Sequence, residues 1–284
     1  MSTIKGANVL VTGGANGIGK LMGLKCLQEG AANLIIWDIN EENLEKTQKE
    51  FNSKGYKNVS THVVDVSNIN DIEKSATEVL LEIGNIDILF NNAGIVAGKK
   101  KFWEYTASDI EKTIQINVSG VMHVTRVFMK DMIKQRKGHI INISSASALI
   151  GLPQGSVYAS SKWAVLGWSE SLRMELEQEG GDLHVTTVCP SYIDTGMFKG
   201  VKAPLLFPLL QPEDISSKII KAVKKNEIIL MQPDNVNLVP ILKGLFPPRV
   251  FDVVAGWLGV YSSMSSFEGR PKEERIPVKK KTVK

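Results

Sequence analysis

Short apolar runs alternate with longer amphipathic stretches along most of this chain. Each short run is nearly continuous in Val, Ile and Leu, which is typical of parallel strands that are covered on both faces. The runs predicted to be strands cover residues 9–12, 34–38, 59–65, 86–91, 139–144, 183–189 and 228–231. The stretches predicted to be helices cover residues 17–28, 41–53, 70–83, 109–135, 157–178 and 212–225.

This alternation of strand and helix predicts βαβ units and therefore an α/β fold. Because such crossovers are right-handed, the helices of a doubly wound Rossmann fold would cover both faces of one seven-stranded parallel sheet. No linker rich in Gly, Ser or Pro interrupts the first 200 residues. We therefore expect one domain over residues 1–270, including an apolar lid and C-terminal extension at 196–267, followed by a disordered basic tail at 271–284.

The net charge of +4 is concentrated at the C-terminus. Residues 270–284 carry seven basic and two acidic side chains, a balance of +5, so the rest of the chain sums to −1. This distribution argues against a nucleic-acid-binding face. The basic tail is either simply solvated or an electrostatic aid to binding anionic lipid.

Cysteines and histidines are few and scattered. Cys26 and Cys189 give no disulfide framework, which fits a reducing compartment. The four histidines lack the close spacing of a metal site, so no metal is expected and a zinc alcohol dehydrogenase is not indicated. No run reaches the roughly 18 apolar residues of a membrane span, and the first strand begins too early for a signal peptide or anchor helix. A cytoplasmic protein is expected, with peripheral contact to a membrane as the alternative.

A glycine-rich loop follows the first predicted strand and opens the first predicted helix. Gly13, Gly17 and Gly19 would let the backbone turn sharply and approach a pyrophosphate. The first N–H groups of the helix and its dipole would bind that anion. Asn16 and Ile18 complete the part of the loop that would line the cofactor.

Asp38 stands at the end of the second predicted strand, as the acidic residue expected after such a loop. A carboxylate there would accept hydrogen bonds from the adenosine ribose hydroxyls and repel a 2′-phosphate. No arginine lies beside it. The sequence therefore predicts NAD(H) rather than NADP(H), unless Asp38 only caps the helix that begins near Glu41.

Tyr158 and Lys162 stand four residues apart, on one face of a predicted helix. The lysine charge, together with the positive nicotinamide ring of bound NAD⁺, would favour the phenolate form of the tyrosine. Such a tyrosine can take a proton from an alcohol, or donate one to a carbonyl, while hydride moves to or from the nicotinamide. Ser145 follows the fifth predicted strand, where its hydroxyl would hold the substrate oxygen beside Tyr158.

Together these motifs resemble the short-chain dehydrogenase/reductase family over about residues 5–230. The matching elements are the TGxxxGxG loop at 12–19, Asn91-Asn92-Ala93-Gly94, Asn117, Ser145 and the Tyr158/Lys162 pair. One position departs from the family's pattern, because Pro190 is followed by Ser191 where Pro-Gly is common. The backbone path beside the nicotinamide is therefore left open.

The resemblance implies a role for each matched residue. Tyr158 would be the acid/base and would also contact the cofactor, Lys162 would bind the nicotinamide ribose, and Ser145 would position the substrate. Asn117, within the long helix 109–135, would hold a water that connects Lys162 to solvent. The further cofactor contacts that it implies are Asp65 to the adenine, Asn91, Ala93 and Gly94 beneath the nicotinamide ribose, and Pro190 and Thr195 beside the nicotinamide.

The chain becomes apolar and proline-rich after Thr195, where the family has a lid over the active site. The side chains that suggest a lipophilic pocket are Met197, Phe198, Leu205, Leu206 and Phe207. A second apolar stretch at 236–260 is interrupted by charges and by two adjacent prolines, so two short amphipathic helices are expected there rather than a membrane span. They would pack on the pocket or a subunit interface, or rest on a lipid surface.

The block 195–198 and this apolar extension resemble the branch of the family that contains the retinol dehydrogenases and 17β-hydroxysteroid dehydrogenases. Those relatives usually carry an N-terminal hydrophobic anchor, which is not expected here. The resemblance implies an NAD(H)-dependent oxidoreductase that interconverts a hydrophobic alcohol (a retinoid, steroid or long-chain alcohol) and its carbonyl. A 3-oxoacyl thioester reductase and a non-catalytic NAD-binding scaffold on a lipid surface remain alternatives. The helices 109–135 and 157–178 are the family's usual contacts in a homodimer or homotetramer.

Overall fold

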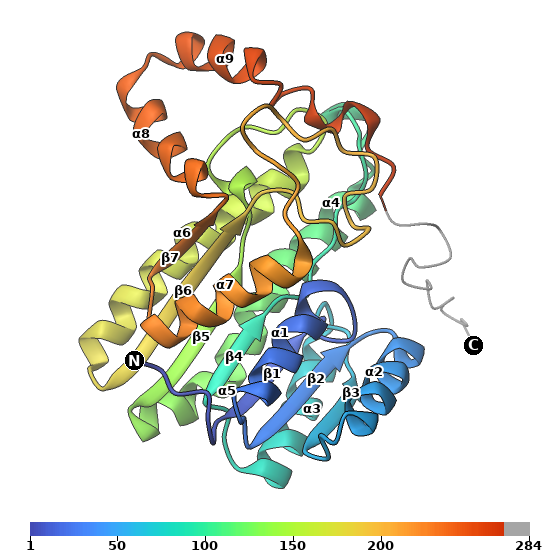
Figure 1. Cartoon of the computed structure of the whole chain (residues 1–284), viewed down its shortest axis with the longest axis vertical. Coiled ribbons are helices and arrows are strands. Elements are labelled where there is room, and N and C mark those ends of the chain that lie inside the picture. Colours follow the sequence, from blue (N-terminus) through green and yellow to red (C-terminus); the bar gives the residue numbers. More distant parts are fainter. Residues whose placement is uncertain (270–284) are drawn as a thin grey trace.

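The computed structural model describes residues 1–269, and the predicted tail at 271–284 lies outside the described residues (Figure 1). All seven predicted strands form within a single sheet in the order β3-β2-β1-β4-β5-β6-β7, and every pair is parallel. The strands are β1 Asn8–Thr12, β2 Asn33–Asp38, β3 Val59–Val63, β4 Ile88–Asn91, β5 Lys137–Ile143, β6 Asp182–Pro190 and β7 Ile229–Gln232. The prediction of a doubly wound parallel sheet is confirmed.

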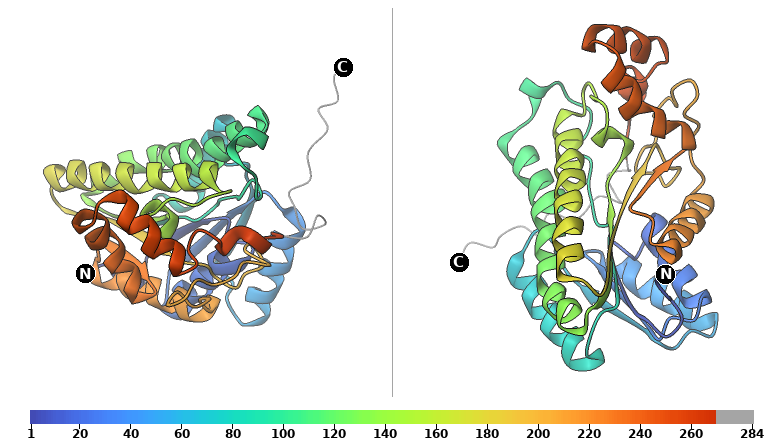
Figure 2. Two further views of the ribbon diagram at one scale, coloured as in Figure 1. Left: turned by 90° about the horizontal axis from the view of Figure 1, so that it is seen from above. Right: turned by 90° about the vertical axis from the view of Figure 1, so that its left-hand side faces the viewer.

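The helices lie on both faces of the sheet (Figure 2). They are α1 Gly17–Gln28, α2 Glu41–Ser53, α3 Ile69–Ile83, α4 Ala107–Ile114, α5 Val121–Gln135, α6 Ser156–Glu179, α7 Pro212–Lys225, α8 Leu238–Leu245 and α9 Pro248–Trp257. Alternate residues of each strand enter different cores, since side chains alternate across a sheet. Thus Val9 and Val11 pack in the core with α1, α2 and α7, whereas Leu10 packs in the core with α3, α5 and α6.

The prediction of one continuous α-helix over residues 109–135 is wrong for its central part. The segment Gln115–Gly120 between α4 and α5 is a π-helix. It passes close to the loop after β3, because a Cβ added at Gly120 would lie 2.5 Å from the Val66 carbonyl oxygen. Hydrophobic periodicity cannot reveal such a turn, since the chain is helical and partly apolar on both sides of it.

Strand order reverses on either side of β1, which pairs with both β2 and β4. The loops after β1 and β4 therefore diverge and leave a crevice at the carboxyl ends of the strands, where open α/β sheets bind ligands. The two predicted C-terminal helices form as α8 and α9, beyond that end of the sheet (Figures 1 and 2). Within residues 1–269, none of the helices is long and apolar enough to cross a bilayer.

His139 lies at the opposite, amino end of the sheet and predicts a pH-dependent stability. Its ring contacts Ser2 Oγ and Thr186 Oγ1, each at 2.8 Å, and lies 5.5 Å from the ring of His184. Burial, with a smaller effect of His184, lowers the pKa of His139 to about 3, against an opposing effect of Asp182. Because the imidazole of the unfolded chain has an ordinary pKa of 6.5, this contribution to stability is present above that pH and is lost as the pH falls from there toward 3.

We expect the free energy of unfolding in urea to be about 1.4 kcal/mol lower at pH 5.5 than at pH 7.5, from this one group. His139→Asn should flatten this dependence, whereas His123→Asn on α5 should leave it as in the wild type. An unchanged pH dependence in His139→Asn would contradict the assignment to His139.

Candidate active site

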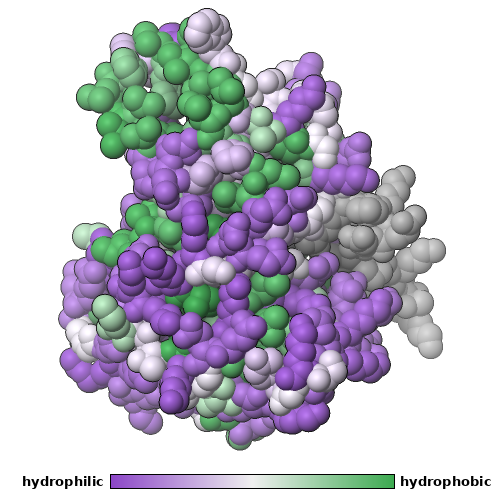
Figure 3. All heavy atoms as spheres, in the orientation of Figure 1, coloured by the Kyte–Doolittle hydropathy of each residue, from purple (hydrophilic) through white to green (hydrophobic). Residues whose placement is uncertain are grey.

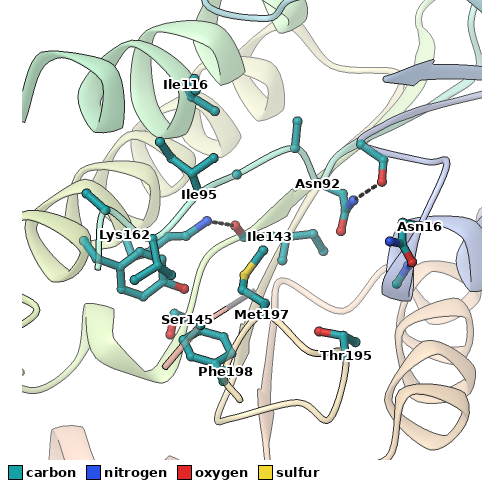
Figure 4. A pocket seen from close by; sticks show the side chains of 18 of the residues that line it. Asn16, Asn92, Ile95, Ile116, Ile143, Ser145, Lys162, Thr195, Met197 and Phe198 are labelled. Carbon is teal, nitrogen blue, oxygen red and sulfur yellow. Dashed lines mark hydrogen bonds between the residues drawn. The ribbon is translucent and has the colours of Figure 1, made fainter. Parts of the chain in front are cut away.

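A cavity of about 850 Å³ runs along the carboxyl ends of the strands. It extends from Asp38, the last residue of β2, past the glycine loop and β4, to Tyr158 on α6 and the segment after β6. Figure 4 shows the part of this cavity between Asn16 and Lys162. The sequence-predicted site residues that line it are Gly13, Asn16, Gly17, Ile18, Asp38, Asp65, Ala93, Gly94, Ser145, Tyr158, Lys162, Pro190 and Thr195. Gly19, Asn91 and Asn117 lie behind this lining.

Close packing of the glycine loop requires two of its three glycines. A Cβ added at Gly19 would lie 2.3 Å from the Gly13 carbonyl oxygen, and one added at Gly13 would lie 2.9 Å from Ala93 Cα. Gly17 instead has φ +55°, a left-handed conformation that favours glycine. Asn16 is the N-cap of α1, where its side chain accepts from the Gly17 N–H at 2.7 Å. The loop therefore presents the positive end of α1 to the cavity.

Asn92 is a cavity residue to which the sequence analysis assigned no role of its own. Its Nδ2 donates to the carbonyl oxygens of Thr12 and Gly13, both at 3.0 Å, and Figure 4 shows one of these two hydrogen bonds. Its main-chain N–H donates to Thr12 Oγ1. These contacts join the loop after β4 to the loop after β1. Two adjacent asparagines in the sequence gave no signal of which one would turn outward.

The side chain of Asn91 points away from the cavity, toward β5 and α5. It is buried, and its Nδ2 donates to Thr125 Oγ1 and Asn142 Oδ1, both at 2.8 Å. These hydrogen bonds link β4 to β5 and to α5. Asn91 is therefore placed to support the cavity floor from below rather than to touch a ligand with its side chain.

Two carboxylates stand at one end of the cavity. Asp38 accepts from the main-chain N–H groups of Ala15 at 3.1 Å and Asn40 at 3.0 Å. The N-cap of α2 is Asn40 and not Asp38, so the helix-capping alternative for Asp38 is wrong. Asp65 accepts from the N–H and hydroxyl of Ser67, which hold the turn after β3. Both carboxylates line the cavity where its wall comes from β2 and β3.

Tyr158 stands at the other end of the cavity and is only 7% exposed. Burial raises the pKa of its phenol, and hydrogen bonding with Ser145 lowers it in part. Ser144 uses its hydroxyl differently, donating to the main-chain carbonyl of Lys162 at 2.8 Å. Of the two adjacent serines, Ser145 is thus the one whose hydroxyl faces Tyr158.

Lys162 lies one helical turn after Tyr158 and is also buried. Its Nζ donates to the Ile143 carbonyl oxygen at 2.8 Å and lies 5.8 Å from the centre of the Tyr158 ring (Figure 4). Burial lowers the pKa of Lys162 to about 8. A lysine poised in this way can change its charge near neutral pH in response to a nearby anion or cation.

Asn117 occupies the π-helical turn and not a regular helix as predicted. Its Oδ1 accepts from the Ile95 N–H at 2.8 Å, and its Nδ2 donates to the Ile95 carbonyl at 2.9 Å and to Ser161 Oγ at 3.1 Å. A Cβ added at Gly94 would lie 3.3 Å from Asn117 Oδ1 and 3.6 Å from Lys162 Nζ. Asn117 therefore holds the loop after β4 against α6, close to the lysine.

The segment predicted to be a lid covers Tyr158, and two of the five residues expected to form the pocket, Met197 and Phe198, line the cavity. Phe198 packs edge-on to Tyr158 at 6.1 Å between ring centres, and Phe267 of the C-terminal extension packs on Phe198. Met197, Phe198 and Phe267 line the cavity. The predicted pocket residues Leu205, Leu206 and Phe207 do not line it, and the first two are mostly exposed. The two ends of the lid segment are joined, because Ile193 before it and Leu210 after it form a β-bridge.

Ser191, in place of the family's glycine, creates no strain. Its backbone φ is not positive, and its N–H donates to the Gln232 carbonyl oxygen at 2.7 Å. The path after Pro190 therefore needs no glycine. The backbone continues to Thr195, whose Cβ lies 3.7 Å from the position of a Cβ added at Gly17. This brings the segment after β6 against the start of α1.

The cavity suits a dinucleotide by shape and by chemistry. Glycines keep the loop after β1 open for a pyrophosphate at the helix terminus, as an added Cβ at Gly17 would fill the space toward Thr195. Carboxylates at one end match ribose and adenine donors, and a phenol and an amine stand at the other. The arrangement can hold a cofactor along its length and exchange a proton with a substrate at Tyr158.

The comparisons with known proteins agree with this geometry. The family model described as short chain dehydrogenase matches residues 7–205. Epidermal retinol dehydrogenase 2 of Mus musculus is 34% identical over 273 residues, which cover 95% of this chain and 88% of that protein. Estradiol 17-beta-dehydrogenase 11 of Homo sapiens is 33% identical over 253 residues, which cover 89% of this chain and 83% of that protein.

Solved structures show the same fold. A short chain dehydrogenase/reductase from Burkholderia phymatum in complex with NAD has a TM-score of 0.75 at 26% identity, covering 84% of this chain and 93% of that chain. A metagenomic short-chain oxidoreductase in complex with NADP has a TM-score of 0.69 at 26% identity, covering 81% of this chain and 96% of that chain. Similar folds thus hold either nicotinamide dinucleotide.

Proposed function

Because this chain belongs to the short-chain dehydrogenase/reductase family of oxidoreductases, we propose that it interconverts a lipophilic alcohol and its carbonyl with NAD(H). The observation that carries the proposal is the buried group of Tyr158, Ser145 and Lys162 beneath the aromatic lid, in one cavity with Asp38. Relatives that are named for retinol and estradiol support this substrate chemistry. A retinoid, a steroid or a long-chain alcohol is the substrate class that we propose.

In the proposed mechanism the phenol of Tyr158 exchanges a proton with the substrate oxygen. It donates that proton during carbonyl reduction and accepts it during alcohol oxidation. Ser145 donates a hydrogen bond to the same oxygen and holds it in reach of Tyr158. When bound, the nicotinamide accepts or supplies the hydride.

Lys162 and Asn117 support this proton transfer. The positive charge of Lys162, close to the Tyr158 ring, favours the phenolate and so opposes the effect of burial. Lys162 Nζ is also the group that would bind the nicotinamide ribose. Since the side chain of Asn117 is engaged by Ile95 and Ser161, its main-chain carbonyl is the group that we propose holds the relay water.

The proposed preference for NAD(H) rests on Asp38. Its carboxylate lines the end of the cavity that we assign to the adenosine, where it would accept from the ribose hydroxyls and repel a 2′-phosphate. The wall around it comes from Ile39, Asn40 and Asn43, none of which carries a positive charge. Asp65 would accept from the adenine amine, and Thr195 would bind the carboxamide at the other end.

Asp38→Asn should lower the ratio of kcat/KM with NAD⁺ to that with NADP⁺ by at least about tenfold, which corresponds to about 1.4 kcal/mol. The substitution removes the negative charge and keeps an oxygen for only one of the two N–H groups, because Ala15 and Asn40 donate to different oxygens of the carboxylate. Steady-state rates with both cofactors measure the ratio. Glu82→Gln on α3 removes one charge far from the cavity and should leave the ratio unchanged. An unaltered ratio in Asp38→Asn would reject the role of Asp38.

The substrate class is tested by absorbance at the reduced-nicotinamide band. Retinol, a 17β-hydroxysteroid and a long-chain alcohol would each be incubated with NAD⁺ or NADP⁺. Turnover with one of these and little with short polar alcohols is expected from the apolar lining by Met197, Phe198 and Phe267. Binding of NADH without turnover of any lipophilic alcohol would reject this substrate class.

We further infer that residues 1–270 act as one unit and that copies assemble through α5 and α6. These helices run side by side along the outside of one layer, as Figure 2 shows, and Met174 on α6 is exposed. A cytoplasmic location is supported by two buried, unpaired cysteines. Sedimentation equilibrium would distinguish a dimer or tetramer from a monomer.

A further inference from the structure

The two helices after β7 are short and amphipathic, as the sequence predicted, with the charged residues Lys243 on α8 and Arg249 and Asp252 on α9. The inner face of α9 buries Phe251 and Ala255 against Ile150, and α8 adds Val239 and Leu242 to this cluster. The apolar face of such a helix normally lies against the interior of a protein or a lipid phase. Within the described residues, however, no other part of the protein covers the outer apolar faces of α8 and α9.

We define the outer patch as the exposed apolar side chains of α8, α9 and the turn between them. Its members are Leu238, Ile241, Leu245, Phe246, Val250, Val253, Val254 and Trp257. On each helix they recur at intervals of three or four, so each set forms one stripe. Trp257 is 92% exposed and Leu245 is 72% exposed. In Figure 3 this patch forms the hydrophobic region over α8 and α9, at the end of the molecule that projects from the body.

The helix pair is anchored on the chain between Ser145 and Tyr158. Lys243 of α8 donates to the Leu149 carbonyl oxygen at 2.9 Å, and its Nζ lies 4.4 Å from the centre of the Trp163 ring. Ile150 belongs to the cluster beneath α9, and Leu152, two residues later, packs with Tyr158. The patch is therefore carried on a segment that also shapes the substrate end of the cavity.

The helix pair is also joined to the lid by main-chain hydrogen bonds. The N–H of Leu205 donates to the carbonyl oxygen of Leu258 at 2.9 Å, and that of Lys202 donates to the carbonyl oxygen of Ser263 at 3.1 Å. The N–H of Glu268 donates to the carbonyl oxygen of Lys199 at 2.9 Å. Further along the same extension, Phe267 packs on Phe198, which covers Tyr158. The lid and the extension that carries the patch thus form one continuous layer over the active site.

A lipid surface fits this patch better than a second protein. Its side chains offer no hydrogen-bonding group other than one indole N–H, so nothing in the patch specifies the register of a protein partner. An exposed tryptophan suits the boundary between acyl chains and headgroups. At the same end of the sheet, the loop after β4 carries exposed Phe102 and Trp103 directly after three consecutive lysines.

Positive charge is available beside the patch. Arg249, at the start of α9, is exposed beside the apolar members of the patch. Residues 270–284, which lie outside the described residues, carry seven basic and two acidic side chains. Anionic headgroups attract such charges, and apolar burial and basic charge add in surface binding. The combination is complementary to an anionic phospholipid surface.

We propose that the outer patch docks on an anionic phospholipid surface and that the lipophilic alcohol reaches Tyr158 from that lipid phase. The second half of this proposal rests on the proposed function, whereas the docking does not. Because the patch and the lid form one layer, docking would bring the aromatic cover of Tyr158 close to the lipid. The apolar cavity end then exchanges substrate with the lipid phase instead of with water.

Docking is tested by sedimentation with vesicles of phosphatidylcholine containing about one fifth phosphatidylserine. The full chain should bind them, and the double variant Val253→Glu/Trp257→Glu should bind at least about tenfold more weakly. Leu81→Glu is the matched control, since Leu81 on α3 is 85% exposed and lies outside the patch. It should bind like the wild type. Equal binding by the wild type and the double variant would overturn the docking proposal.

Activity assays separate docking from catalysis. The double variant should keep the wild-type rate with retinol presented without vesicles and lose at least about tenfold with retinol presented in the vesicles. Wild-type vesicle binding without any turnover would reject the proposed function and leave docking supported. If the wild type does not bind vesicles and the double variant instead dissociates a dimer in sedimentation equilibrium, the patch is a protein interface and the proposal fails.

Discussion

Tyr158→Phe should lower kcat by about 10²–10⁴-fold with any substrate that the wild type turns over, because the variant loses the group that exchanges the proton. The change removes one oxygen and keeps the ring, which packs against Phe198 and the cluster around Leu152. The shape of the cavity should therefore persist. Single-turnover measurements of reduced nicotinamide give the rate of the chemical step.

The controls for Tyr158→Phe are cofactor affinity and pH dependence. NADH fluorescence should report a Kd within about threefold of the wild type, since we assign the phenol to the substrate oxygen. In the wild type the rate of alcohol oxidation should rise with pH, because burial raises the pKa of Tyr158 and the phenolate is the proton acceptor. The residual rate of the variant should not show this rise. A variant that retains full activity would assign the proton transfer to another group.

Gly19→Ala should abolish cofactor binding, with a loss of at least about 100-fold in NADH affinity. Its Cβ would lie 2.3 Å from the Gly13 carbonyl oxygen and 2.5 Å from Asn92 Nδ2, so the loop after β1 must move away from the loop after β4. This displacement breaks the hydrogen bonds that Asn92 donates to Thr12 and Gly13. Overpacking of this kind costs about 1–3 kcal/mol, and the broken hydrogen bonds add to it.

Gly167→Ala is the matched control for this substitution. Gly167 lies within α6, and an added Cβ there would meet no atom within 4 Å. Alanine should therefore leave NADH affinity unchanged and stabilise the helix by about 0.5–1 kcal/mol. Isothermal titration with NADH and thermal unfolding measure the two effects. If Gly19→Ala bound NADH as tightly as Gly167→Ala, the loop would tolerate a wider path than the packing of Gly13 and Asn92 allows.

The strands and most helices could be predicted because their signal is local. The central strands β1, β2 and β4 are short apolar runs that are buried on both faces, and helices such as α3 and α7 carry one apolar stripe. Their periodicity is therefore visible in the sequence. The π-turn at Asn117 could not be predicted in this way. It depends on hydrogen bonds between the Asn117 side chain and Ile95, which is far from it in sequence.

The sequence by itself determined the seven-stranded doubly wound sheet, the glycine loop, Asp38 and the Tyr158/Lys162 pair, since chain order and short-range spacing specify them. Only the tertiary structure decided which of Asn91 and Asn92 faces the cavity, and that Phe267 rather than Leu205 or Leu206 completes its lining. It alone also showed that α8 and α9 leave one apolar face outward. The physical reason is that composition determines how apolar a segment is, whereas the direction in which each side chain points depends on the elements packed against it.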